Sequence, residues 1–266
     1  MSFAEIPEFE SSFKSTEYVK LVSGVPQQFR ILSETAHHVE KHFIPVSKIS
    51  VLCLGEETCP ICQNNAKLKQ EHEDVSPRQI RGYLPRQNRY MVNVLNRTTV
   101  KVSPSGNVTF PTQGQFPTND PQTGELLVNI EAKPLDKVQV LERGPTLFAQ
   151  LNAINDTVAD PETGNPLGLW TYDVVITASG SGRKMTTNVI PYPNMNDEVN
   201  LPEEDIFILE TLGIQLSPEE MTLAVRGVSL RDIFEARRAT DESLVGSDPQ
   251  VISDDVQEKI ETLFPQ

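Results

Sequence analysis

The sequence predicts an α+β protein that is rich in β-structure. Two observations predict this class. Up to about residue 196, short segments of alternating or clustered β-branched and aromatic residues are separated by Pro, Gly and Asn. Beyond Pro193 the pattern changes to helix-start signals. Several short strands with long, turn-rich connections predict a small closed barrel or sandwich, followed by helices.

Turn signals separate the β-patterned segments. The motif Asp-Pro-x-Thr-Gly occurs twice, at 120–124 and 160–164, and predicts tight turns because Pro presets φ and Gly supplies a positive φ. The stretch SGSGRK, 179–184, reads as a hairpin tip with two positive charges. The β-patterned segments are QFRIL (28–32), FIPVSKISVL (43–52), YMVNVLNRTTVKV (90–102), KVQVLE (137–142) and LWTYDVVITAS (169–179).

The helical part begins with two N-cap signals. Ser217 is followed by Pro218 at the first helical position and Glu220 at the third, which is a capping box, and Ser229 with Asp232 imitates it. The chain is therefore divided into four parts. These are an N-terminal arm (1–26), a β-rich core (27–196) that includes a metal-binding subdomain at about 37–75, a helical appendage (197–240) and an acidic C-terminal tail (241–266).

Composition excludes several classes of protein. No window approaches 18 consecutive apolar residues, and the first residues have neither a basic nor an apolar signal-peptide region, so we expect a cytosolic protein without a membrane partner. Three cysteines cannot all pair within one chain, and a reducing compartment would keep them free. Metal binding or redox chemistry remains for the thiols.

All three cysteines lie within ten positions, and their spacing is typical of a structural zinc site. Cys59 and Cys62 form a C-x₂-C pair, the spacing at which two thiolates on one turn bind the same tetrahedral ion. Cys53 offers a third thiolate, and His42 is the best fourth ligand, with His37, His38 and His72 as competitors. A closed set of four protein ligands stabilises a fold and does no catalysis.

Three other interpretations of the cysteines stay open but fit less well. Reduced core cysteines are the simplest. A redox dithiol needs a βαβ context that the pattern lacks. A zinc deaminase needs H-x-E and P-C-x-x-C, which His38-Val-Glu40 and Cys59-Pro-Ile-Cys62 imitate, but Thr58 replaces the Pro and Cys53 has no role.

A basic stretch runs from Ser76 to Lys101, with six Lys and Arg and no Asp or Glu in 26 residues. Its arginines are interleaved with Tyr83 and Tyr90. Proteins that hold single-stranded nucleic acid combine a positive groove with aromatic faces for base stacking. The alternative is a charged edge strand that prevents aggregation, but such an edge usually mixes both signs of charge.

The order of these features resembles the single-stranded-DNA-binding proteins of tailed phages, the helix-destabilising protein family of T-even phages. The similarity covers roughly residues 10–195: an arm, then His, Cys and C-P-x-C, then basic residues leading into RYMVNVLNR, DKVQVLERGPTLFAQL and TYDVVITASGSGRK. The resemblance implies an OB-fold core that binds single strands, a zinc subdomain, an arm for self-association along DNA and an acidic tail for protein partners. In the family, a cluster of basic residues precedes a Ser-Thr pair in the arm. In this chain only Lys14 precedes Ser15-Thr16.

The function predicted from the sequence is non-enzymatic, largely sequence-independent binding of single-stranded DNA in phage replication, recombination and repair, in the cytoplasm of the infected bacterial host. The sequence contains neither a P-loop nor a G-x-S-x-G motif, so it gives no support for an enzyme. The alternative is a zinc-containing transcription factor or polymerase-associated adaptor that works through protein contacts. The expected nucleic-acid contacts are Arg81, Tyr83, Arg86, Arg89, Tyr90, Arg97, Lys101, Arg183 and Lys184.

The negative charge is concentrated at the C-terminal end. Residues 197–266 contain 17 acidic and five basic residues, a net charge of −12 out of −14 for the chain. This end is expected to bind replication, recombination or transcription proteins, with Val256, Ile260, Leu263 and Phe264 on one apolar helical face. A flexible acidic segment can also occupy a basic groove as a phosphate mimic, and a purely solubilising tail is the alternative.

Overall fold

A computed structural model of the chain describes residues 17–112, 114–160, 163–192 and 199–245, without the side chains of Arg183 and of 240–245. The chain divides into two compact units. Unit 1 comprises Met1–Lys41 and Arg86–Gly213, and unit 2 comprises His42–Pro85 and Ile214–Gln266. Most of the predicted arm and most of the predicted tail lie outside the described residues, and the four-part division stays a prediction.

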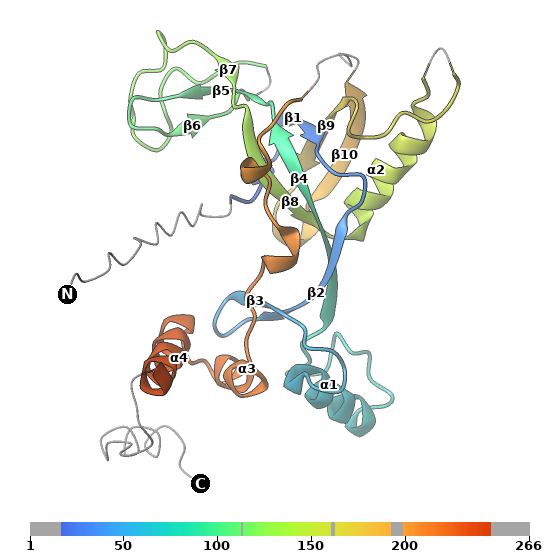
Figure 1. Cartoon of the computed structure of the whole chain (residues 1–266), viewed down its shortest axis with the longest axis vertical. Helices are drawn as coiled ribbons and strands as arrows, with labels where there is room; N and C mark the ends of the chain where they lie inside the picture. Colours follow the sequence, from blue (N-terminus) through green and yellow to red (C-terminus); the bar gives the residue numbers. More distant parts are fainter. Residues whose placement is uncertain (1–16, 113, 161–162, 193–198, 246–266) are drawn as a thin grey trace, which may run out of the picture. The chain divides into compact units, whose positions relative to one another are not determined.

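Unit 1 is built on an antiparallel sheet with the strand order β10-β9-β1-β4, in which β8 and β2 also pair with β4 (Figure 1). A second sheet has the order β6-β5-β7. The strands are β1 Pro26–Ile31, β2 His37–Ile44, β4 Arg86–Asn96, β5 Thr99–Val102, β6 Val108–Thr109, β7 Lys133–Pro134, β8 Lys137–Arg143, β9 Asp173–Ser179 and β10 Thr186–Tyr192.

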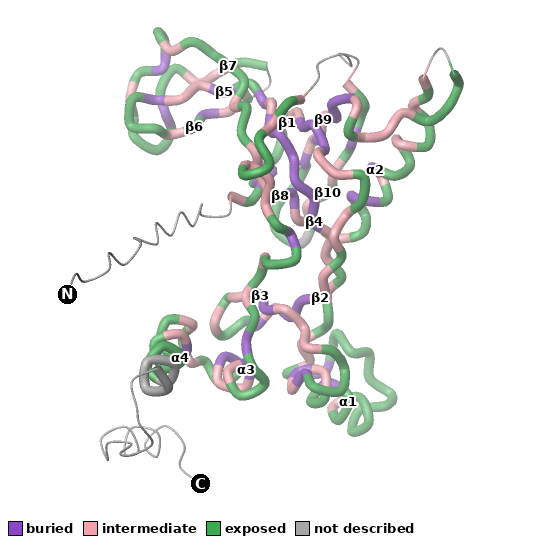
Figure 2. Tube along the Cα trace, in the orientation of Figure 1, coloured by how far each residue is buried: buried purple, intermediate pink, exposed green. Residues whose placement is uncertain are grey.

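The two faces of β4 pack against different parts of unit 1, because successive side chains of a strand point to opposite faces. Tyr90, Val92 and Val94 belong to the main apolar cluster, which α2 (Pro145–Thr157) covers through Leu147, Phe148 and Leu151. Met91 belongs to a smaller cluster with Val39, Val140, Phe207, Leu209 and Leu212. Buried residues run along the centre of the sheet (Figure 2).

The segment after β10 contributes to this smaller cluster and contains two short 3₁₀ helices, η2 (Glu203–Asp205) and η3 (Leu209–Thr211). A third, η1 (Gly182–Lys184), lies at the tip of the β9–β10 hairpin, where SGSGRK predicted a turn. In both Asp-Pro-x-Thr-Gly motifs the Gly N–H donates to the Asp carbonyl, and Gly124 and Gly164 have φ of 72° and 69°, as the predicted turns require.

The α+β class predicted from the sequence is confirmed, with a sheet that is mostly antiparallel and few helices. The closed barrel is not confirmed. Among the described residues neither strand path returns to its first strand, so neither sheet closes.

Unit 2 consists of β3 (Ile49–Leu52) and three helices, α1 (Pro60–Glu71), α3 (Pro218–Val225) and α4 (Leu230–Val245). The predicted capping box is confirmed: Ser217 Oγ accepts from the Glu220 N–H, and the Glu220 carboxylate accepts from the Ser217 N–H. Ser229 caps α4 differently: its Oγ accepts from the Asp232 N–H and donates to the Asp232 carboxylate. The core of unit 2 is a cluster around Ile44, Val51, Ile61, Leu216, Met221 and Ile233.

Candidate metal centre and candidate nucleic-acid interface

Unit 2 brings all four predicted metal ligands together. The ligand atoms of His42, Cys53, Cys59 and Cys62 lie within 4.8 Å of one another. They come from three local contexts: His42 from the end of β2, Cys53 from the residue after β3, and Cys59 and Cys62 from the start of α1. The four side chains could hold one metal ion, and no disulfide joins the three cysteines.

The turn between β3 and α1 explains how Cys53 reaches the other two thiols. Gly55 has a φ of 92°, and its carbonyl accepts from the Cys59 N–H, which reverses the chain. Pro60 occupies the first turn of α1, where its missing N–H costs nothing. Residues three apart share a helical face, so Cys62 lies beside Cys59.

The distances suit tetrahedral coordination. The Sγ atoms of Cys53 and Cys62 are 3.6 Å apart, and Cys62 Sγ lies 3.3 Å from His42 Nε2. A tetrahedron with metal–sulfur distances of about 2.3 Å places two thiolates about 3.8 Å apart, and a sulfur and a nitrogen slightly closer. The residues present therefore fit a Cys₃His ion site.

A second layer of hydrogen bonds orients the histidine. Nδ1 of His42 lies 3.0 Å from the carbonyl oxygen of Leu84. Because a carbonyl only accepts, Nδ1 carries the proton and Nε2 keeps its lone pair toward the thiols. The side chain of Asn65 holds Leu84 in turn, donating to its carbonyl at 2.6 Å and accepting from its N–H at 3.0 Å. His42 and Asn65 thereby fix the end of the loop that carries Arg81 and Tyr83.

The surroundings of the thiols disfavour their charged form. Burial raises the pKa of Cys62 to about 12, and hydrogen bonding to Cys53 adds to this shift. Burial also raises the pKa of Cys53. The metal-free thiols of Cys53 and Cys62 are therefore neutral near pH 7. A divalent cation supplies the charge that thiolates need, so metal binding releases protons.

The competing histidines lie elsewhere. The His37 imidazole is 3.8 Å from Glu210 Oε1, and His38 contacts Asn88 and the Tyr90 ring, all in unit 1. His72 follows the last turn of α1 and is exposed. In the described part of the chain, His42 is the histidine that joins the three cysteines.

The basic stretch is divided between the two units. Arg78 and Arg81 are exposed in the unit 2 loop before β4. Tyr83 is half-buried there, and the Lys69 ammonium lies 5.6 Å from its ring centroid. The remaining predicted contacts, from Arg86 onward, belong to unit 1.

The start of β4 carries two arginines and a tyrosine. Arg86 forms an ion pair with Glu40 at 3.1 Å, with both side chains about one-third exposed. Arg89 donates to the side-chain oxygen of Gln87 at 2.8 Å. The Tyr90 ring is half-buried between His38 and Phe148, with ring centroids 4.9 and 5.4 Å away.

Further along, the cations are more engaged with the protein. Arg97 is 18% exposed and contacts Asp173 at 3.3 Å, and the same buried carboxylate accepts from Arg30 at 2.5 Å. Lys101 donates to the Leu127 carbonyl and lies over the Phe116 ring. Lys184 is exposed in η1, and the side chain of Arg183 is outside the described part. Their roles in DNA binding stay predictions.

Sequence reasoning missed two residues, Arg143 beside the start of β4 and the exposed Trp170. Arg143 lies directly opposite Tyr90 in the β4–β8 register. Burial lowers the pKa of its guanidinium, and the nearby Arg89 contributes to the shift. Trp170 is 43% exposed. The KVQVLE pattern ended one residue before Arg143, so extending the strand would have found it, whereas nothing in the sequence indicated the exposure of Trp170.

No family model and no curated protein matches the chain. In the described part of the chain, no helix has the length and apolar character needed to span a bilayer.

Proposed function

We propose that the chain is a non-enzymatic protein that binds single-stranded DNA largely without regard to sequence. It acts in phage DNA replication, recombination and repair, in the cytoplasm of the infected host. In this proposal unit 1 is an OB-fold, and the arm and the acidic C-terminal end serve self-association and protein partners. The observation that carries the proposal is the basic stretch without a single acid, which includes the whole of β4, the long strand of the unit 1 sheet.

The chemistry of binding follows from two kinds of contact. Exposed guanidinium groups such as those of Arg78 and Arg81, with Arg89 on β4, attract phosphates and release counterions. Aromatic rings that are only half-buried, as Tyr83 and Tyr90 are, offer a face to an unpaired base. A carboxylate would weaken phosphate binding, so the absence of acids from 76 to 101 favours this use.

The metal of this proposal is one structural zinc ion, held by His42, Cys53, Cys59 and Cys62. Zinc is the usual ion of Cys₃His sets, and four protein ligands leave no position for a reacting water. The ion would stabilise unit 2, and it would keep Leu84, and with it the loop of Arg81 and Tyr83, in place through His42.

A second function, a transcription or polymerase-associated adaptor, is favoured by one observation. Arg86 and Arg97, two of the predicted phosphate contacts, are already paired with carboxylates. An adaptor would use the metal-bound unit and the acidic helices for protein contacts, and would have no affinity for bare oligonucleotides.

A titration with poly-dT, poly-U and duplex DNA at several salt concentrations tests the proposal. We expect tight binding of poly-dT and a slope of log K against log [salt] near −3 to −4, since about four to six phosphate contacts each contribute about −0.7. Arg89→Glu should make the slope shallower by at least about 0.7. Tyr90→Ala should lower the affinity with almost the same slope, because it removes stacking and no charge.

Arg231→Glu is the matched control, because Arg231 is an exposed arginine on α4, outside the basic stretch. It should leave the slope unchanged. Equal affinity for duplex, or no affinity for any polynucleotide, would contradict the proposal, and the second result would favour the adaptor.

A further inference from the structure

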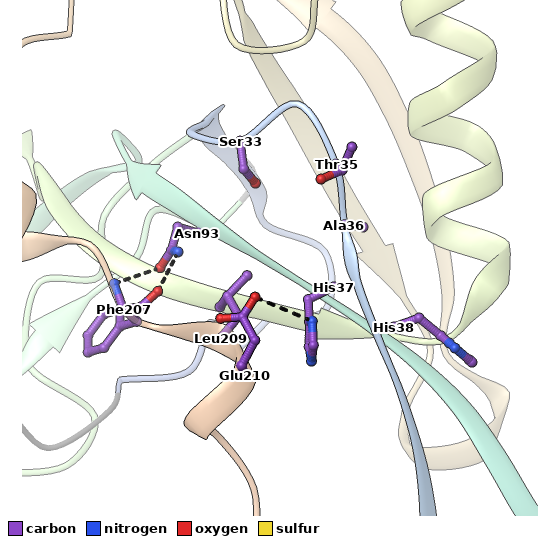
Figure 3. A pocket seen from close by; sticks show the side chains of 9 residues that line it. All are labelled: Ser33, Thr35, Ala36, His37, His38, Asn93, Phe207, Leu209 and Glu210. Carbon is purple, nitrogen blue, oxygen red and sulfur yellow. Dashed lines mark hydrogen bonds and ion pairs between the residues drawn. The ribbon is translucent and has the colours of Figure 1, made fainter.

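Unit 1 contains a pocket of about 350 Å³ at the connection between β1 and β2 (Figure 3). This volume is within the range of small-ligand sites. The pocket lies entirely within unit 1, so its geometry does not depend on unit 2. The residues that matter for its chemistry are Ser33, Thr35, His37, Asn93, Phe207 and Glu210.

The wall formed by residues 207–210 is held firmly on β4. The Asn93 side chain donates to the Phe207 carbonyl at 2.9 Å and accepts from its N–H at 3.2 Å. Leu209, which is 8% exposed, packs with Met91 and Val140 of the sheet. A side-chain amide that satisfies both backbone groups of one residue fixes that segment, so the pocket is formed before any ligand arrives.

Some polar groups of the pocket lack hydrogen bonds to the rest of the described protein. The hydroxyl of Ser33 is buried and has no hydrogen-bond partner among the described residues. His37 Nδ1 and Glu210 Oε1 are directed toward each other but are 3.8 Å apart, too far for a hydrogen bond (Figure 3). Buried polar groups are normally paired, so the Ser33 hydroxyl has hydrogen-bonding capacity left for a ligand.

The charges of the lining residues select the class of ligand. No Lys or Arg lines the pocket, and Glu210 does, so a phosphate group would be repelled. A neutral planar molecule with hydrogen-bond donors beside acceptors would match the hydroxyl, imidazole and carboxylate groups of the lining residues. Its apolar face could contact the side chain of Leu209. An unpaired nucleobase has these properties.

We propose that this pocket takes one base of the bound single strand and prefers a base with an exocyclic amino group. The amino group donates to the Glu210 carboxylate, and the Ser33 hydroxyl pairs with the neighbouring acceptor. Cytosine presents an amino group where thymine presents a carbonyl, and a carboxylate can only accept. The inference rests on the proposed function, to which it adds a base preference at one position of an otherwise sequence-tolerant site.

The test compares oligo-dC with oligo-dT of equal length, about 12 nucleotides, at pH 8 and fixed salt, on the full chain. We expect wild type to bind oligo-dC about three- to tenfold more tightly than oligo-dT. This ratio is at the lower end of the discrimination that a direct base contact gives, because water weakens hydrogen bonds to Glu210, which is 71% exposed. Glu210→Gln should reduce this ratio to within about twofold of unity, because an amide can also donate to thymine. Ser33→Ala should lower the ratio without loss of stability, because Ser33 has no partner to lose.

Glu203→Gln is the matched control, since it removes the same charge from an exposed position of the same segment outside the pocket lining. It should keep the wild-type ratio. Binding of both oligonucleotides without discrimination, or discrimination that survives Glu210→Gln, would overturn the base pocket and leave the proposed function intact. Absence of binding to either oligonucleotide would overturn both.

Discussion

Unit 1 and unit 2 bury their side chains on different scales. The main cluster of unit 1 contains 15 buried residues, from Val19 to Val189, and two faces of its sheet are covered. The cluster of unit 2 contains eight, one of which is the ligand Cys59. A small core supplies little net stability after the entropy of folding is subtracted, and small units usually need a metal or disulfides. We expect that a metal ion bound to the four-residue cluster would supply the stability that the small core of unit 2 lacks.

The two units also differ in how they bury charge. Unit 1 encloses an ion-pair network in which Asp173, 1% exposed, accepts from Arg30, Arg97 and Gln28. Unit 2 instead buries the His42 imidazole beside three thiols. The Asp173 carboxylate of unit 1 is paired by side chains of the protein itself, whereas the cluster in unit 2 would reach full coordination only with a cation.

Removing the metal should have the largest effect, and it should affect unit 2 but not unit 1. Structural zinc contributes on the order of 10 kcal/mol to small metal domains, so chelation should unfold unit 2 and leave unit 1 folded. NMR spectra should lose the dispersed amide signals of residues 42–85 and 214–245 and retain those of unit 1. Elemental analysis should find about one zinc ion per chain.

Two histidine variants sharpen this experiment. His42→Ala should abolish metal retention, whereas His72→Ala, at an exposed helix end, should retain the ion. Metal affinity should fall as the pH is lowered, because the raised pKa of Cys62 means that binding must displace its proton. Metal-free protein with an intact unit 2 would contradict the structural role.

Breaking the charge network should damage unit 1 alone. Asp173→Asn leaves the buried guanidinium of Arg30 without a full counter-charge, which costs about 3–5 kcal/mol in comparable sites. Urea unfolding should show an earlier transition of unit 1, with the metal content of unit 2 unchanged. Asp136→Asn is the control, because Asp136 is exposed and Asn tolerates its φ of 45°. Equal unfolding midpoints for the two variants would refute the importance of the network.

The smallest expected effect concerns the acidic end. Truncation after Thr240 removes seven acidic residues and one lysine. If that end competes with DNA for the basic stretch, the shortened chain should bind oligonucleotides severalfold more tightly at low salt and equally at high salt, where charges are screened. Truncation after Val245, which keeps α4 complete, separates the effect of the tail from that of the helix end. Unchanged low-salt affinity would favour a purely solubilising tail.

Most of the strands were predictable from β-branched and aromatic patterns, but two helices were not. Pro60 and Pro145 stand at the first turns of α1 and α2 and are helix-start signals. In α2, Leu147, Phe148 and Leu151 have helical spacing, yet they follow a strand pattern after one glycine. The helix α1 is short and mostly polar, so its sequence lacks the apolar stripe that would predict a helix. Local patterns of about three turns do not decide the element type, because tertiary contacts supply most of a helix's stability.

By itself, the sequence determined the α+β class, the capping box at Ser217, the N-cap Ser229, the hydrogen-bonded Asp-Pro-x-Thr-Gly motifs and the four side chains that could hold a metal ion. These features depend on residues close together in the chain, where steric and hydrogen-bonding rules act directly. Ligand chemistry limited the choice of residues in the same way, since few side chains bind a soft cation. The place of His42 at the head of the apolar run favours it over the other three histidines as the fourth metal ligand.

The tertiary structure alone decided which side chains meet across long separations. Asp173 pairs with Arg30 and Arg97, Asn93 holds Phe207, and Leu84 accepts from His42, although 42 to 143 residues separate the partners in each pair. It also joined α3 and α4 with the cysteine segment in one unit. No local pattern encodes these pairings, because they depend on how strand register and apolar burial bring distant segments of the chain together.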